Sequence, residues 1–309
     1  MFGVLDVAWM QASVRSLTSI GFASVGETVG QRSGVLNIGL EGVMLSGALA
    51  AALGSSGTGS PWVGVACAAL TGVLVTLLFA VFVVTLKTDH IVIGVGINLL
   101  AVGLTTYVFR LVFASRTSVT VPAFEELPIP LLSGIPVVGD VLFDQIPLVY
   151  LLFVLVPLSV FLLRRTSWGL RIRAVGEHPQ AADTAGVRVD VVRYGAQLFA
   201  GALAGIGGAV LSIGNLNLFA ENMTAGRGFI ALAAVIFGRW HPVGAFGACV
   251  LFGAVDALQF RLQGLESGIP SQIWLAMPYV LGLVVLAGMA GRSRMPSALG
   301  TPFRRQREE

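Results

Sequence analysis

Long apolar runs separated by short polar breaks dominate the chain. Between Gly42 and Leu86 there is no Asp, Glu, Lys, Arg or His, and the polar sequence GSSGTGSP at residues 54–61 divides this stretch in two. Uninterrupted runs of about 20 apolar residues are typical of transmembrane helices. The pattern predicts membrane spans at residues 7–25, 34–53, 62–86, 91–113, 147–163, 191–213, 243–262 and 272–290, with a shorter apolar piece at residues 227–237.

Two of these segments differ from an ordinary span. Residues 7–25 include Gln11 and Arg15, so the segment is amphipathic and either crosses the membrane or lies along its interface. Residues 227–237 rise only about 16 Å as a helix, against a hydrocarbon core of about 30 Å, which indicates a half-span. The predicted fold is an all-α polytopic membrane protein with about 8–10 transmembrane helices, including a short or broken one.

Composition supports a membrane protein. Hydrophobic residues make up 55% of the chain and charged residues 11%, with a mean hydropathy of +0.86, whereas soluble domains carry about 25% charged residues. The first ten residues contain Asp6 and no base, so we expect no cleaved signal peptide. Cys67 and Cys249 each lie within an apolar segment, which predicts buried thiols and neither a disulfide nor a metal site.

The basic residues indicate an orientation. If the loop at residues 164–191 is cytoplasmic, the same side collects fourteen of the nineteen bases, namely Arg32, Lys87, Arg164, Arg165, Arg171, Arg173, Arg188, Arg193, Arg239, Arg292, Arg294, Arg304, Arg305 and Arg307. The other side receives the acids Glu125, Glu126, Asp140, Asp144, Glu221 and Glu266. Under the positive-inside rule the loop and the C-terminus are cytoplasmic, and the N-terminus is outside if the first segment crosses.

Polar side chains within the predicted spans are the candidates for chemistry. In a helix over residues 34–53, Asn37 and Glu41 lie one turn apart on one face, and an ionisable group at membrane depth marks a functional site by default. Glu41 either faces a transport pathway or only ties helices together by hydrogen bonds. The same two interpretations apply to the other polar residues in spans or at their ends, Asn98, Gln197, Asn215, Asn217, Asn222 and Asp256. Three aromatic residues either stack on a substrate or pack in the bundle: Phe219, Phe229 and Trp240.

The loop at residues 166–194 contains a second informative pattern. Helix-forming residues run from Pro179 to Ala185, with proline suited to a first turn and Gly186 to a stop, so a short exposed helix is predicted. Such a helix either docks a partner or serves as a solvated connector that bears arginines.

Four stretches resemble a known group of membrane proteins. Residues 32–51 (RSGVLNIGLEGVMLSGALAA), 94–105 (GVGINLLAVGLT), 169–187 (GLRIRAVGEHPQAADTAGV) and 226–259 are similar to permease subunits of ATP-binding-cassette importers. The group is the branched-chain amino acid, simple-sugar and nucleoside superfamily. The sequence NIGLEG in the second span most resembles the purine and general nucleoside branch.

The resemblance implies a function and a set of partners. It implies a permease subunit that moves nucleosides into the cell across the plasma (inner) membrane by alternating access. Its partners would be a second permease, often a related but different chain, a cytoplasmic ATPase and an external substrate-binding lipoprotein. The chain carries no GxxxxGK[ST] phosphate loop, so it is predicted to be no enzyme and to hold no cofactor, with ATP and Mg bound on the ATPases.

The resemblance also assigns regions and residues. Residues 1–291 would form the permease domain, with a cytoplasmic coupling loop at 164–193 and an external loop at 114–146, and residues 292–309 a basic cytoplasmic tail. The coupling-loop pattern falls on Gly176, Glu177, Pro179, Ala181, Ala182 and Gly186. Two residues depart from the family: His178 stands where relatives usually carry Asn, and Gln31 where they usually carry an acid, which predicts that an ion pair is absent there.

Other functions remain open on the sequence. The chain would alternatively be a permease of the same kind for a simple sugar or other small solute. A different class is an ion-coupled secondary transporter in which Glu41 or Asp256 takes up the proton. Neutral amides suit the uncharged donors and acceptors of a nucleoside. An intramembrane enzyme has no support, because the three histidines, His90, His178 and His241, lie apart from any nucleophile motif or paired carboxylates. No nucleic-acid partner is expected.

Overall fold

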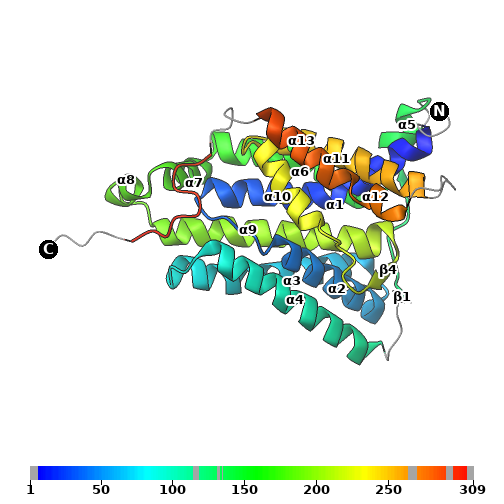
Figure 1. Ribbon diagram of the computed structural model, residues 1–309, viewed down its shortest axis with the longest axis horizontal. Helices are drawn as coiled ribbons and strands as arrows, with labels where there is room; N and C mark the ends of the chain where they lie inside the picture. Colours follow the sequence, from blue (N-terminus) through cyan, green and yellow to red (C-terminus); the bar gives the residue numbers. More distant parts are fainter. Residues whose placement is uncertain are drawn as a thin grey trace.

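The computed structural model describes residues 6–113, 118–130, 133, 135–263, 270–289 and 295–304 of the 309-residue chain (Figure 1). The longer helices are α1 (Val7–Arg32), α2 (Leu40–Thr58), α3 (Pro61–Ala80), α4 (His90–Val112), α6 (Pro147–Arg165), α7 (Ser167–Glu177), α9 (Val189–Ala209), α10 (Arg227–Phe237), α11 (Pro242–Gln263) and α13 (Met277–Met289). The shorter elements are two π-helical turns, η1 (Val81–Thr85) and η2 (Val210–Asn215), the helices α5 (Val138–Leu142), α8 (Pro179–Thr184) and α12 (Ser271–Leu275), and the strands β1 (Ser118–Thr120), β2 (Leu127–Pro128), β3 (Asp144–Gln145) and β4 (Leu218–Ala220).

The long helices run along one axis of the molecule. Figure 1 shows α7, α8 and the C-terminus at one end of this axis, and α5, β1, β4 and the N-terminus at the other. Helix α9 packs on α1, α2 and α3, and α1 packs in addition on α10 and α11. These two central helices therefore join an α2–α3–α4 layer to the layer that contains α10, α11 and α13.

The predicted all-α polytopic class is confirmed. In the described part of the chain, five helices are long and apolar enough to cross a membrane: Pro61–Thr85, His90–Val112, Pro147–Arg165, Val189–Asn215 and Pro242–Gln263. Helices α1 and α2, with 26 and 19 residues, are also long enough. Two further apolar helical segments, Arg227–Phe237 and Gln272–Val285, are shorter. The bounds predicted for the half-span, residues 227–237, are those of α10.

Helix α1 is a central member of the bundle. It extends to Arg32, seven residues beyond the predicted end of the first span, and its residues are almost all buried from Ser13 to Gln31. A helix lying along the membrane interface would leave its polar face in water. The burial of α1 on nearly all sides, parallel to α9 in Figure 1, therefore excludes the interfacial alternative.

The second predicted span begins later than its apolar sequence indicates. Gly34 has a φ of +90°, a left-handed conformation that ends α1, and α2 starts only at Leu40. Asn37 thus lies in an irregular link before the helix, and the prediction that Asn37 and Glu41 share a helical face is wrong. The break leaves backbone N–H and C=O groups without partners inside a helix, and side chains from distant elements satisfy them. The apolar sequence of residues 34–39 therefore does not reveal the break.

Two further segments differ from the predictions. The last span is divided into α12 and α13, since the ring of Pro278 removes a backbone donor and crowds the preceding turn. The loop at residues 166–194 contains the predicted short helix, α8, which ends before Gly186 at a φ of +84°. It also contains α7, which the sequence did not indicate, because its two bases and two glycines within residues 167–177 hide the helical period.

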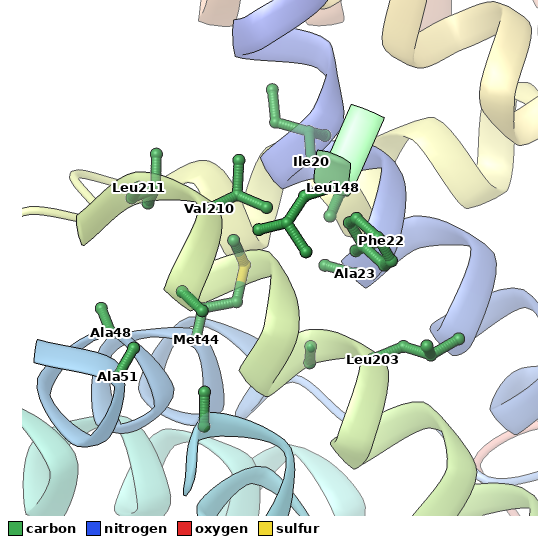
Figure 2. Close-up of a cluster of buried hydrophobic side chains, with 14 of the residues drawn as sticks. Ile20, Phe22, Ala23, Met44, Ala48, Ala51, Leu148, Leu203, Val210 and Leu211 are labelled. Atoms are coloured by element: carbon green, nitrogen blue, oxygen red, sulfur yellow. The ribbon is translucent and has the colours of Figure 1, made fainter. Parts of the chain in front are cut away.

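Small residues allow the central helices to approach closely. Gly201 and Gly205, four residues apart on α9, both lie at the contact with α3. A Cβ atom on Gly201 would collide with the carbonyl of Gly72 in α3, and one on Gly208 with the carbonyl of Met44 in α2. Figure 2 shows the buried core beside these contacts, to which α1 contributes Ile20, Phe22 and Ala23, α2 Met44, Ala48 and Ala51, α6 Leu148, α9 Leu203, and η2 Val210 and Leu211.

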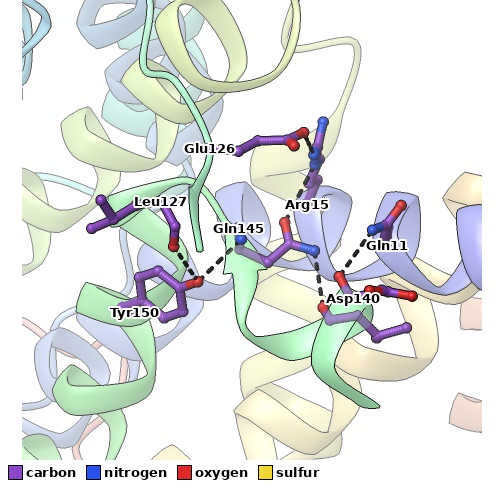
Figure 3. Close-up of polar contacts among 8 residues, drawn as sticks. Gln11, Arg15, Glu126, Leu127, Asp140, Gln145 and Tyr150 are labelled. Atoms are coloured by element: carbon purple, nitrogen blue, oxygen red, sulfur yellow. Dashed lines mark hydrogen bonds and ion pairs between the residues drawn. The ribbon is translucent and has the colours of Figure 1, made fainter. Parts of the chain in front are cut away.

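The end of the bundle that carries the N-terminus is closed by short elements. Strands β1 and β4 pair antiparallel, as do β2 and β3. Figure 3 shows how α1 is attached to this region: Gln11 donates to the carbonyl of Asp140 at 2.9 Å, and Arg15 pairs with Glu126 and donates to Gln145. The predicted external loop, residues 114–146, is therefore folded against α1 in its described parts.

The C-terminal segment packs on the opposite end. Residues 295–304 belong to the expected basic tail, yet the backbone N–H of Ala298 donates to Gly176 at 2.9 Å and that of Gly300 to Gly34 at 3.0 Å. Phe303 is buried among apolar residues of α1, α6, α7 and α9. The residues Arg292, Arg294, Arg305, Arg307 and Glu266, counted above for orientation, lie outside the described residues.

Candidate functional site

A cavity of about 550 Å³ opens between α1, η2, α10, α11 and α13. Most of its lining is apolar, with side chains such as Leu211, Met223 and Ile230. The polar side chains that reach it are Arg15, Ser16, Asn215, Arg227, Asp256, Gln259 and Tyr279. A largely apolar cavity with a few polar groups in one part is typical of a site for a small organic ligand.

The strongest polar feature of the cavity is an ion pair. Arg227, the first residue of α10, lies 3.1 Å from the carboxylate of Asp256 in α11, and the two side chains are 13% and 7% exposed. Because both charges are nearly buried, each would be costly without the other. Gln259 lies one turn after Asp256 on α11 and is also buried. Paired in this way, the two charges leave the cavity close to electrically neutral.

Asn215 approaches the cavity from the end of η2. Its Nδ2 donates to the backbone carbonyl of Arg15 at 3.2 Å. Its Oδ1 is buried and has no hydrogen-bond partner among the residues that the structure describes. An acceptor of this kind is available for a donor group of a bound solute.

Glu41 holds the beginning of α10. Its two carboxylate oxygens accept hydrogen bonds from the backbone N–H groups of Gly226 at 2.8 Å and Gly228 at 2.7 Å. Gly228 is in direct contact with the Glu41 backbone, where a Cβ atom would clash. The carboxylate thus satisfies free donors at a helix N-terminus, where negative charge is favourable. Tyr279 of α13 supports the same turn by donating to the carbonyl of Ala225 at 2.9 Å.

Three other predicted pathway residues surround the link between α1 and α2. Asn98 accepts from the N–H of Gly42 at 2.8 Å and donates to the carbonyl of Ile38 at 3.0 Å. Asn37 accepts from the N–H of Gly39 at 2.9 Å, and Gln197 donates to the carbonyl of Val35 at 3.1 Å. These side chains satisfy the backbone of the break, and none of them lines the cavity.

The last two predicted residues lie in exposed turns. Asn217 and Asn222 have φ values of 53° and 56°, a conformation that asparagine tolerates better than most residues. Of the eight predicted pathway residues, the structure therefore brings Asn215 and Asp256 to the cavity. Sequence reasoning missed Arg227, Gln259 and Tyr279. The sequence does contain a signal for two of them. Arg227 is a base at the start of the predicted half-span, and Gln259 is an amide three residues after Asp256.

A buried acid in α1 was also missed. The side chain of Glu27 is fully buried, and its Oε1 accepts from Gln31 at 3.1 Å and from the N–H of Asn37 at 3.1 Å. Gln31 in turn accepts from the indole N–H of Trp240 at 2.6 Å. Trp240 is thus a packing residue, as is Phe219, which is fully buried. In the described residues no group of three or more His, Cys, Asp or Glu could hold a metal ion.

The predicted coupling residues divide into a packed and an exposed set. Gly176, Pro179 and Ala182 are buried, and the backbone of Gly176 contacts the carbonyl of Arg32. Glu177 lies 3.9 Å from the Arg32 guanidinium and accepts from the Ser297 hydroxyl at 3.1 Å. Ala181 and Gly186 are exposed. The short helix α8 therefore presents one surface outward while α7 fixes it to the bundle.

Comparison with known proteins identifies relatives along the whole chain. The chain is 38% identical over 290 residues to the guanosine ABC transporter permease protein NupQ of Bacillus subtilis, covering 91% of each. It is 38% identical over 299 residues to the nucleoside ABC transporter permease protein NupC of Lactococcus lactis, covering 93% of each. It is 34% identical over 325 residues to the putative glucose ABC transporter permease protein TsgC13 of Haloferax volcanii, covering 96% of this chain and 97% of that one.

No solved structure matches the chain. The family model described as the permease component of the branched-chain amino acid transport system matches residues 10–290. This match takes in the described helices from α1 to α13, the cavity and both sets of coupling residues. The extent of the match, together with these relatives, shows that the chain belongs to this family of permease components.

Proposed function

We propose that this chain is the permease subunit of an importer that carries nucleosides into the cell. The observation that supports this most is its 38% identity, along more than nine-tenths of each chain, to two permeases named for guanosine and nucleosides. As a permease component the chain works in a multi-pass membrane complex with an ATPase and a substrate-binding protein. ATP hydrolysis lies in the partner subunits.

The cavity lined by Asn215 and Asp256 is the proposed solute site. Its volume of about 550 Å³ lies within the range of small-molecule pockets, about 300–1,000 Å³. Apolar walls and Tyr279 suit the flat face of a base, whereas Asn215 and Gln259 offer hydrogen bonds to base edges or ribose hydroxyls. Because Arg227 and Asp256 neutralise each other, an uncharged solute leaves no charge without a partner.

The other predicted pathway residues have a supporting role in this proposal. Glu41 positions α10 at the edge of the site, and Asn37, Asn98 and Gln197 hold the α1–α2 link. Asn217 and Asn222 shape the turns that lead from η2 to α10. The helices that line the site can then shift as rigid units, since their backbone groups stay satisfied.

The coupling loop, residues 164–193, receives the ATPase in this proposal. The exposed surface of α8, with Ala181 and Gly186, is the docking surface, and the contacts of Glu177 with Arg32 and Ser297 carry its movement to α1. The arginine distribution supports a cytoplasmic position for this loop and for residues 292–309, and an external position for residues 114–146. The remaining proposed partners are a second permease, an external lipoprotein and the plasma membrane itself.

Uptake of radiolabelled guanosine into proteoliposomes that contain the complete complex tests the proposal. We expect uptake that requires ATP and continues when the proton gradient is collapsed. Asn215→Ala is expected to raise KM about fivefold, the equivalent of about 1 kcal/mol for one hydrogen bond. Glu125→Gln, an exposed change outside the cavity, serves as the control. ATP-independent uptake contradicts the importer mechanism.

A second candidate solute is a simple sugar, which the identity to the permease TsgC13 favours. The same assay separates the two solutes by competition. An excess of unlabelled adenosine is expected to block guanosine uptake, whereas glucose is expected to leave it unchanged. ATP-dependent uptake of glucose without any uptake of guanosine favours the sugar permease instead.

A further inference from the structure

A second cavity, separate from the proposed solute site, lies at the end of the bundle that carries α7 and α8. Its volume is about 140 Å³. The charged and titratable side chains that line it are Arg32 at the end of α1, Arg164 near the end of α6, Arg173 in α7, and His241, which precedes α11. Four elements thus direct basic groups toward one small space. We call this space the basic cavity.

Backbone contacts hold these basic groups together. Gly169 of α7 packs directly on the backbone of Leu162 and Leu163 in α6, and Gly176 of α7 packs on the carbonyl of Arg32. A side chain at either glycine would push α7 away from its neighbour. Helix packing therefore fixes the backbone positions from which the three arginines extend, and the basic cavity is a feature of the fold.

The charges of the basic cavity are not balanced by protein groups. The carboxylate of Glu177 lies 3.9 Å from Arg32, but it is 44% exposed and also accepts from Ser297. Among the residues that the structure describes, Arg164 and Arg173 have no carboxylate within 4.0 Å. Arg32 uses its Nε to donate to the carbonyl of Trp240 at 2.7 Å. The basic groups thus gather without a carboxylate between them, an arrangement that favours an anion.

Unsatisfied polar atoms mark the same place. The Nε of Arg173 and the Nε2 of His241 are buried and have no hydrogen-bond partner in the described part of the chain. Partial burial lowers the pKa of His241, and the nearby guanidinium groups of Arg164 and Arg32 lower it further. His241 therefore reports on the local charge: an anion in the cavity offsets the arginines and raises this pKa.

The cavity lies at the ends of two apolar helices, where we expect lipid headgroups. It is formed at the ends of α6 and α11, both long and apolar enough to cross the membrane. Leu158 and Phe161 are exposed on α6 within two turns of Arg164, and Val243 is exposed on α11 beside His241. These apolar surfaces would contact acyl chains directly next to the basic groups.

We propose that the basic cavity binds the phosphate group of an anionic phospholipid whose acyl chains lie along α6 and α11. Guanidinium groups pair with phosphate oxygens through strong, charge-assisted hydrogen bonds. Basic pockets between membrane helices are suited to anionic headgroups. Bound there, the lipid joins α1, α6, α7 and the start of α11, and so stabilises the base of the coupling loop. This proposal does not depend on which solute is transported.

The test uses the full chain in nanodiscs with selectively labelled histidine, since the chain has only three histidines. The pH titration of His241 is recorded by NMR in phosphatidylcholine, in phosphatidylcholine with phosphatidylglycerol, and in phosphatidylcholine with inorganic phosphate. Retained phosphatidylglycerol is counted in parallel by native mass spectrometry. A charge-matched pair of double variants completes the design: Arg164→Gln with Arg173→Gln, and Arg165→Gln with Arg171→Gln, two exposed bases that do not line the cavity.

We expect phosphatidylglycerol to raise the pKa of His241 in the parent chain and in the Arg165/Arg171 variant. The Arg164/Arg173 variant is expected to lose this response and to bind phosphatidylglycerol at least about tenfold more weakly. Equal losses in both variants would show general surface attraction and overturn the proposal. If inorganic phosphate raises the pKa of His241 and phosphatidylglycerol does not, the ligand is a free phosphate and the lipid assignment is overturned. If neither phosphatidylglycerol nor inorganic phosphate changes this pKa, the proposal is also overturned.

Discussion

Replacing Glu41 by Gln tests whether this carboxylate holds the half-span α10 in place. In the structure its two oxygens accept from the N–H groups of Gly226 and Gly228 at 2.8 and 2.7 Å, and Glu41 is 7% exposed. Glutamine has a similar shape but only one acceptor oxygen. Its NH₂ group would face the second N–H donor, which then stays without a partner in a largely dry environment.

The size of the effect follows from these contacts. A hydrogen bond to a charged group contributes about 1.5–3 kcal/mol. The interaction of a negative charge with a helix N-terminus adds about 0.3–2 kcal/mol. Losing one bond and the charge together is expected to weaken the attachment of α10 by about 2–5 kcal/mol. Each 1.4 kcal/mol corresponds to a factor of ten, so local opening becomes about 30- to 4,000-fold more frequent.

Hydrogen exchange followed by mass spectrometry measures this opening directly. Peptides that cover residues 226–231 are expected to exchange faster in Glu41→Gln by that factor, because exchange of a protected amide reports the free energy of local opening. Peptides from α6, which packs on α1, α7 and α11, are expected to keep their rates. Glu125→Gln is the matched control, since Glu125 is exposed and lies in the connection between β1 and β2.

One result would refute the reasoning. If the exchange of residues 226–231 rises by less than about threefold in Glu41→Gln, the two hydrogen bonds do not hold α10. A loss of uptake in Glu41→Gln without faster hydrogen exchange would instead indicate that Glu41 contacts the solute directly.

Three further changes test other parts of the fold. Phe303→Ala is expected to release residues 295–304, since removing a buried phenyl ring costs about 3–5 kcal/mol; protease sensitivity of this segment is compared with that of the exposed neighbour Arg304→Ala, which is expected to be unchanged. Gly208→Val is expected to lower the yield of monodisperse protein in size-exclusion chromatography, because its side chain would collide with the α2 backbone. Arg110 donates two hydrogen bonds to Glu221 and holds the pKa of that carboxyl below its usual value of 4.5. The pair therefore stabilises the loop fully above pH 4.5 and loses this contribution as the pH falls below it. The protection factors of residues 218–225, which correct for the intrinsic pH dependence of amide exchange, are expected to fall in acid in the parent chain and to lose this acid dependence in Arg110→Gln.

Hydropathy alone predicted most helices because burial in lipid demands long apolar segments. The bounds of α10 and the short helix α8 were also correct, since Pro179 and Gly186 mark the ends of α8 locally. The break between α1 and α2 was not predictable in this way. Its backbone is satisfied by Gln197 from α9, at 3.1 Å from the Val35 carbonyl, and by His90 from α4, which accepts from Leu36 at 3.1 Å.

The candidate site was predicted in part for a related reason. Polarity within an apolar span identified Asn215 and Asp256, whose surroundings the structure shows to be a cavity. The same criterion selected Glu41 and Asn98, which bind backbone groups of neighbouring helices instead. A polar residue that binds solute and one that satisfies a helix end have the same pattern in sequence. Only the three-dimensional arrangement separates them.

The position of Phe303 has a consequence for the synthesis of the protein. This side chain belongs to the same buried cluster as Val29 in the first helix. Because Phe303 is synthesised after all the described helices, that cluster stays open and α7 lacks its contact with Ala298 until residues 295–304 have been made. The surface proposed for the ATPase is then completed late in synthesis. A chain interrupted after α13 would thus be distinguishable from one that extends to Phe303.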